Sequence, residues 1–147
     1  MTLGARSYAT CFGLATAFFV FSTLVSDVAA RMTIQREGLG HALSEHAYYA
    51  AAQPIGTLML LLPFLLVAWM GASLAQRKSM SAGVTLVVST CSVLAAMCFD
   101  GFQDSQAYLA QESWTASALS VGLLPFQSIP VVAVALVAFL ILRRVAG

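Results

Sequence analysis

Four long uncharged stretches, separated by short polar segments, dominate the pattern of this chain. They cover residues 7–26, 47–76, 79–99 and 113–142, with lengths of 20, 30, 21 and 30 residues. A helix that crosses membrane hydrocarbon needs about 20 apolar residues. The stretches are apolar on every face and lack the alternation of a membrane β-strand. The pattern predicts an all-α fold: an integral membrane four-helix bundle in a single transmembrane domain over residues 1–147, with spans at about 8–30, 55–75, 80–99 and 117–142.

The polar segment between the first two spans has a helical pattern of its own. Gly38 and Gly40 mark a break, and Leu39, Leu43 and Ala47 recur at every fourth position. We expect a short extracytoplasmic interfacial helix between spans 1 and 2.

Prolines interrupt the second and fourth apolar stretches. Pro63 lies in the middle of the second span, where a missing hydrogen bond favours a kink. Pro125 and Pro130 predict a bent or broken piece over 115–128, followed by a regular helix over about 129–142.

Composition supports a membrane location. Apolar residues make up 60% of the chain and charged residues 9%, and the mean hydropathy is +0.87. A water-soluble domain of this size carries about 25% charged residues. A net charge of +1 also gives no basic field for phosphates. These values exclude an ordinary cytosolic enzyme and a nucleic-acid partner.

The charges sort by sign. Five of the seven basic residues share one side of a four-span chain: Arg6, Arg77, Lys78, Arg143 and Arg144. The other side carries all six carboxylates and both histidines. The positive-inside rule therefore predicts that both termini are cytoplasmic.

Two further inferences concern the membrane. One lysine against six arginines, with abundant alanine, favours a GC-rich bacterial source, so we expect a multi-pass protein of the bacterial inner membrane. Val28-Ala29-Ala30 is an alternative signal-peptide cleavage site, and cleavage there would leave three spans. The apolar run before it is longer than the core of most signal peptides.

Two rows of small or hydroxylated residues predict close helix packing. Ala9, Gly13 and Ala17 recur at every fourth position of the first span, where they would let another helix approach. In the third span Ser81, Thr85 and Ser89 share a face and have hydroxyl groups for a neighbouring helix.

The outer polar segments hold the candidate chemistry. His41, Glu45 and His46 form an H-x3-E-H pattern, for which a metal site is an alternative to a solvated His41–Glu45 pair. The spans contain no histidine that would bind a haem. Asp27 and Arg31 are four residues apart and are expected to pair across one helical turn.

No catalytic constellation emerges from these residue types. Asp100 and Asp104 lie in a polar outer segment, 100–114, without the convergence that paired catalytic acids require. We expect the three cysteines, Cys11, Cys91 and Cys98, to be small buried apolar residues without a disulfide. The expectation is a protein that is not an enzyme and holds no metal or cofactor.

Two segments carry a resemblance to a known family. The run from Trp69 to Lys78, with its glycine and basic end, and the later stretch from Pro125 to Ile141 loosely resemble the small membrane subunit of tripartite (TRAP-type) transporters. The resemblance implies four spans, inner termini and a role as a subunit of a transporter.

The favoured hypothesis is a non-enzymatic accessory or scaffold subunit of a larger membrane complex. Its expected partners are the lipid bilayer, other membrane subunits and an extracytoplasmic protein. The predicted docking residues are His41, Glu45, Asp100, Asp104 and Glu112. The alternatives are a small transporter or oligomeric channel component, and an immunity protein that binds a toxin at the outer face.

Overall fold

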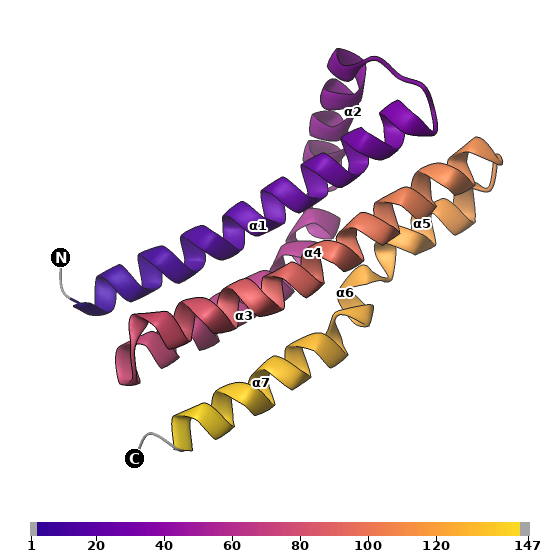
Figure 1. Cartoon of the computed structure of the whole chain (residues 1–147). Helices are drawn as coiled ribbons and strands as arrows, with labels where there is room; N and C mark the ends of the chain where they lie inside the picture. Colours follow the sequence, from indigo (N-terminus) through magenta and orange to yellow (C-terminus); the bar gives the residue numbers. More distant parts are fainter. Residues whose placement is uncertain (1–2, 145–147) are drawn as a thin grey trace.

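The computed structural model describes residues 3–144, which contain seven helices and no strand (Figure 1). The helices are α1 (Leu3–Thr33), α2 (Leu39–Ala52), α3 (Pro54–Arg77), α4 (Met80–Ala110), α5 (Trp114–Gly122), α6 (Leu124–Gln127) and α7 (Ile129–Arg144). Four stretches are long and apolar enough to cross a membrane: α1, α3, α4 and the run from α5 to α7. The all-helical fold and the four helices of membrane-spanning length are therefore confirmed.

Helix α4 is longer than the sequence predicts. The pattern predicts that the third span ends at Phe99 and that a separate polar segment with helical spacing at Asp104, Tyr108 and Glu112 follows, whereas α4 continues without a break to Ala110. The helix continues because Gly101, Ser105 and Gln106 are buried along one of its faces, and such packing stabilises helices more than propensity does. Its 31 residues extend about 46 Å, about 16 Å more than a hydrocarbon layer of about 30 Å. Helix α4 is therefore longer than the hydrocarbon layer of a membrane is thick.

A helix also forms between the first two spans. Helix α2 turns away from the end of α1 at a steep angle (Figure 1) and leads into α3 through Gln53. Pro54 begins α3, at the position where a missing N–H costs no helical hydrogen bond. The predicted helix is therefore present, and its place at the membrane interface stays a prediction.

The last apolar stretch is broken, as its prolines indicate. Helix α5 returns antiparallel along α4, α6 is a single turn, and α7 then runs beside α3 (Figure 1). Pro125 lies in the first turn of α6 and Pro130 in the first turn of α7. A proline is tolerated in the first turn of a helix but interrupts a continuous one.

The core lies between α1, α3 and α4, where glycines allow close contact. Gly71 of α3 and Gly83 of α4 face each other, and a Cβ on Gly71 would lie only 2.9 Å from the Gly83 carbonyl oxygen. Phe64 and Val87 are among the fully buried side chains nearby, and Phe19 of α1 packs edge-on against Phe64. Close approach at small residues is how helices associate without help from the hydrophobic effect in lipid.

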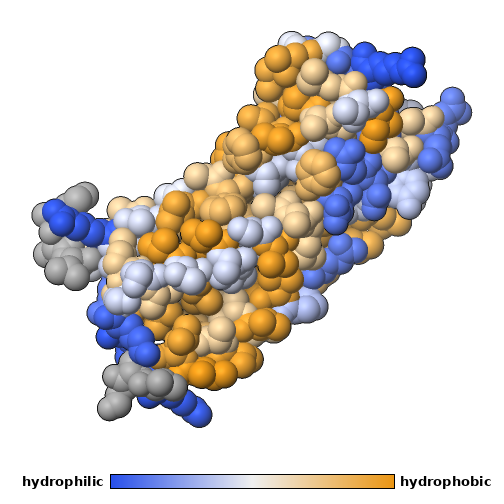
Figure 2. Space-filling view, in the orientation of Figure 1, coloured by the Kyte–Doolittle hydropathy of each residue, from blue (hydrophilic) through white to orange (hydrophobic). Residues whose placement is uncertain are grey.

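The arrangement of the helices separates the charges into two ends. The start of α1, the turn between α3 and α4 and the end of α7 lie together (Figure 1), and they carry Arg6, Arg77, Lys78, Arg143 and Arg144. We call this the basic end. The opposite end, called the acidic end, carries Asp27, Glu37, Glu45, Asp100, Asp104 and Glu112, together with Arg31 and Arg36. Figure 2 shows blue surface concentrated at both ends and an orange middle.

Candidate functional site

A buried ion pair stands at the acidic end of α1. Asp27 and Arg31 are only 4% and 8% exposed, and the Arg31 Nε donates to both carboxylate oxygens of Asp27 at 3.1 and 3.2 Å. The two residues are one helical turn apart, so this pairing confirms the expectation from the sequence. A buried charge requires such partners because its desolvation is expensive.

Two other helices complete the coordination of Asp27. The amide Nε2 of Gln106, on α4, donates to Asp27 Oδ1 at 2.9 Å. The His46 Nδ1, on α2, is 3.0 Å from Asp27 Oδ2. The Asp27 carboxylate thus joins α1, α2 and α4.

Arg31 is surrounded in a similar way. Its NH1 atom is 3.6 Å from Glu37 Oε1 and 4.0 Å from Glu45 Oε2, and its guanidinium lies 5.4 Å from the centre of the Tyr49 ring. Such a contact with an aromatic face is favourable for a cation. We call the set Asp27, Arg31, Glu37, Glu45, His46 and Gln106 the polar cluster.

Two buried acceptors of the polar cluster have no hydrogen-bond donor among residues 3–144. They are Glu37 Oε2 and Gln106 Oε1. Gln35 lies close by, and its amide donates to the backbone oxygen of Gln106 at 3.0 Å. Three carboxylates therefore share one guanidinium and one imidazole, so the cluster is rich in acceptors.

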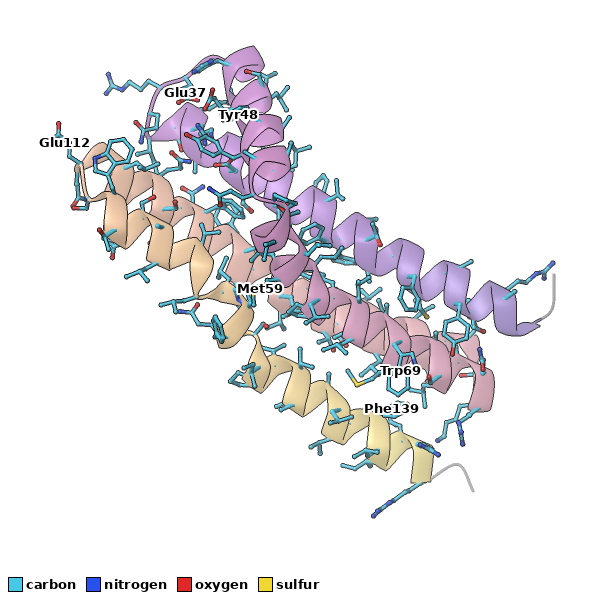
Figure 3. The ribbon with its side chains drawn as sticks, turned by 180° about the vertical axis from the view of Figure 1, so that it is seen from behind. Glu37, Tyr48, Met59, Trp69, Glu112 and Phe139 are labelled. Atoms are coloured by element: carbon cyan, nitrogen blue, oxygen red, sulfur yellow. The ribbon has the colours of Figure 1, made fainter. Side chains whose placement is uncertain are left out.

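The residues predicted to dock a partner separate into two groups. Glu45 belongs to the polar cluster, half-buried and directed at Arg31, whereas His41 is exposed on the same helix. Asp100, Asp104 and Glu112 are exposed and have no side-chain partner within residues 3–144. Figure 3 shows Glu37 and Glu112 at the same end of the molecule.

The exposed acids lie on α4 and on the turn to α5, two elements that are joined by a hydrogen bond. Asp100 and Asp104 lie on α4 and not in a loop, and Glu112 has a positive φ of 59° in the turn to α5. The buried hydroxyls of Ser105 on α4 and Ser117 on α5 form a hydrogen bond with 2.8 Å between their oxygens, which joins α5 to α4.

The predicted packing rows point away from the core. Ala9, Gly13 and Ala17 are exposed on α1, and a Cβ on Gly13 would meet nothing within 4 Å. The internal contacts of α1 instead use another face, with Cys11 and Ala15 fully buried. This row therefore does not join α1 to another helix within residues 3–144.

The hydroxyl row on α4 is also exposed. Ser89 donates to the carbonyl of Thr85 in its own helix at 2.7 Å, and Ser81 lies 3.0 Å from Ser79, hydroxyl to hydroxyl. A pale band along the first half of α4 marks this weakly polar surface in Figure 2. Contact with a helix of another subunit stays a prediction for both rows.

The histidines and cysteines do not gather into a metal-binding set within residues 3–144. His46 is bonded to Asp27 while His41 is exposed, and residues 3–144 hold no group of three metal-ligating side chains that could surround an ion. Cys11, Cys91 and Cys98 are buried and free of disulfides.

A comparison of the chain with protein families, curated proteins and solved structures finds no match. The resemblance to the small subunit of tripartite transporters therefore stays a prediction. The structure accounts for two of its residues by packing: Gly71 contacts Gly83, and the Trp69 ring lies 6.2 Å from that of Phe139.

Sequence reasoning missed Gln106 and Gln35. Their only signal is polarity in a segment that reads as a solvated loop, so nothing along the chain indicates that they are buried or bonded. The pairing of Asp27 with Arg31 was accessible because it depends on local helical spacing alone.

Proposed function

We propose that this chain is a non-enzymatic, four-span accessory or scaffold subunit of a larger complex in a bacterial inner membrane. In this proposal both termini are cytoplasmic and the acidic end faces the extracytoplasmic side, where it docks a partner. The observation that carries the proposal is the exposure of the small-residue row on α1 and the hydroxyl row on α4, neither of which contacts another helix within residues 3–144.

The reason is the physics of helix association in lipid. Small residues let helix backbones approach closely and gain van der Waals contact, whereas large side chains keep them apart. The chain uses this device internally at Gly71 and Gly83. The row of Ala9, Gly13 and Ala17 offers the same device to a helix of another subunit.

The polar cluster supports the proposal at the acidic end. It holds α2 and α4 against α1 through Asp27, so the exposed acids are presented on a fixed surface. Asp100, Asp104 and Glu112 lack cationic partners within residues 3–144, and a basic surface of an extracytoplasmic protein would supply them.

The first test addresses the rows in the membrane. Gly13→Leu is compared with Val20→Leu, which changes a residue 51% exposed on the same helix. After mild crosslinking in native membranes, co-purifying proteins are quantified by mass spectrometry. We expect Gly13→Leu to lose a membrane partner that Val20→Leu keeps. Equal recovery with both variants would exclude this row as the contact.

The second test addresses the acids. Charge reversal at Asp100 and Asp104 is compared with Arg36→Glu, a reversal at the same end on an exposed residue. We expect the acid reversal to release an extracytoplasmic partner that Arg36→Glu retains. Unchanged association after the acid reversal contradicts this docking surface.

A further inference from the structure

An apolar groove of about 380 Å³ runs between α3 and α7. Met59, Leu62 and Leu66 line it from α3, Ala133 and Leu136 from α7. Among the lining side chains only that of Ser128 is polar. The groove lies between two candidate membrane spans, α3 and the run from α5 to α7, so lipid hydrocarbon is the solvent expected to fill it.

The groove exists because α7 contacts the bundle at few points. The break at α6 turns the chain away from α4, and α7 buries only Ala135 and Phe139. Phe139 meets Trp69 with ring centres 6.2 Å apart, which closes the gap near the basic end. Figure 3 shows this pair at one end of the gap and Met59 toward the other.

Both walls of the groove end in unpaired cations. Arg77 is the last residue of α3 and Lys78 follows it, and Arg143 and Arg144 end α7. All four are exposed, and no carboxylate within residues 3–144 lies within ion-pair distance of them. Basic residues beside a gap between membrane helices attract the phosphate of anionic lipids.

The end of the groove nearest the basic end lies about one leaflet deep. Leu136 precedes Arg143 by about 10 Å of helix and Leu66 precedes Arg77 by about 16 Å, whereas Met59, at the far end, precedes Arg77 by about 27 Å. One leaflet of hydrocarbon is about 15 Å thick. A lipid with its phosphate at the basic end therefore places the end of its chain in the part of the groove nearest the basic end, around Leu136 and Ala133.

We propose that the chain binds an anionic phospholipid of the leaflet at the basic end. Its acyl chain lies in the groove between α3 and α7, passing over the exposed edge of Trp69, and its phosphate contacts Arg77, Lys78, Arg143 and Arg144. This site is independent of the acidic end and of the rows on α1 and α4, so the proposed subunit role can fail while the lipid site holds.

The test uses Trp69 as a reporter. The chain has two tryptophans, so Trp114→Phe leaves Trp69 as the only one. This variant is placed in mixed bilayers whose brominated acyl chains are carried either by phosphatidylglycerol or by phosphatidylcholine. We expect stronger quenching of Trp69 by brominated phosphatidylglycerol. Equal quenching by both lipids would overturn the proposal.

Two matched pairs of variants locate the site. In the Trp114→Phe background, Ala133→Phe fills the groove, and Val134→Phe adds the same bulk at an outward residue 71% exposed. We expect the preference for phosphatidylglycerol to vanish in the first variant and persist in the second. Its persistence in both would exclude the groove.

Charge is tested in the same way. Arg143→Gln with Arg144→Gln removes two cations at the basic end, and Arg36→Gln removes one at the acidic end. We expect the double substitution to weaken the preference for phosphatidylglycerol about 25-fold, because each basic residue contributes about fivefold. Arg36→Gln should leave it unchanged. An unchanged preference after loss of both Arg143 and Arg144 contradicts the assignment of the phosphate.

Discussion

At the scale of single residues, Asp27 is the central acceptor of the polar cluster, bonded to Arg31, His46 and Gln106. Asp27→Asn leaves Arg31 buried beside weaker partners, and removal of one member of a buried pair costs about 3 kcal/mol. We expect a clear fall in the unfolding midpoint of the purified protein in detergent. Asp100→Asn, an exposed change of the same kind, should leave the midpoint unaltered.

A double variant separates charge from shape. Combining Asp27→Asn with Arg31→Gln removes both buried charges, so part of the loss should be recovered. A double variant no more stable than the sum of its single changes would argue against a net contribution from the ion pair.

Gly83 gives a second residue-scale prediction. A Cβ at this position would lie 2.7 Å from the Ala75 Cβ and closer still to the Gly71 carbonyl oxygen. Gly83→Ala should therefore force α3 and α4 apart and cost about 2 kcal/mol of unfolding free energy. Gly13→Ala meets open space and serves as the control, with no loss in the same detergent unfolding measurement.

At the scale of elements, α2 depends on the polar cluster for its position. It buries Ala42 alone, so contacts of its apolar face contribute little. His46→Ala removes its bond to Asp27, and His41→Ala changes an exposed residue on the same helix. We expect faster amide hydrogen exchange over 39–52 in His46→Ala only. Equal exchange in both variants would show that Arg31 contacts alone hold α2.

The sequence predicts elements where the signal is local and fails where it is not. The four apolar stretches and the break at Pro125 and Pro130 follow from composition and backbone chemistry. The extension of α4 to Ala110 does not, because it depends on the packing of Leu124 from α6 against Gly101 and on the bond of Gln106 to Asp27 of α1. Those contacts join residues far apart along the chain, and a single sequence gives no sign of them.

The same limit applies to faces of helices. Small residues at every fourth position indicate a surface suited to close packing, but they do not indicate which helix packs against it. Two such surfaces exist on α1, and the one with Cys11 and Ala15 is the internal one. The charges of the candidate site and its local Asp27–Arg31 pair were therefore predictable, but its contacts between helices were not.

At the scale of the whole molecule, the separation of charges predicts orientation. Lys78→Cys places a thiol at the basic end and Gln111→Cys one at the acidic end, both exposed. The three natural cysteines are buried. A membrane-impermeant maleimide added to spheroplasts should label Gln111→Cys but not Lys78→Cys. The reverse pattern would place the acidic end in the cytoplasm and overturn the proposed topology.

The buried carboxylate also has a consequence for synthesis. The partners of Asp27 lie at increasing distances after it along the chain. Arg31 comes four residues later, His46 19 residues later and Gln106 79 residues later. At about 5–20 residues per second, Asp27 waits about 4–16 s for its last hydrogen bond. Because Arg31 pairs with Asp27 on the same helix, a first span that inserts as proposed would enter the bilayer with these two charges already paired. The order of translation thus closes the local pair first and brings α4 to it last.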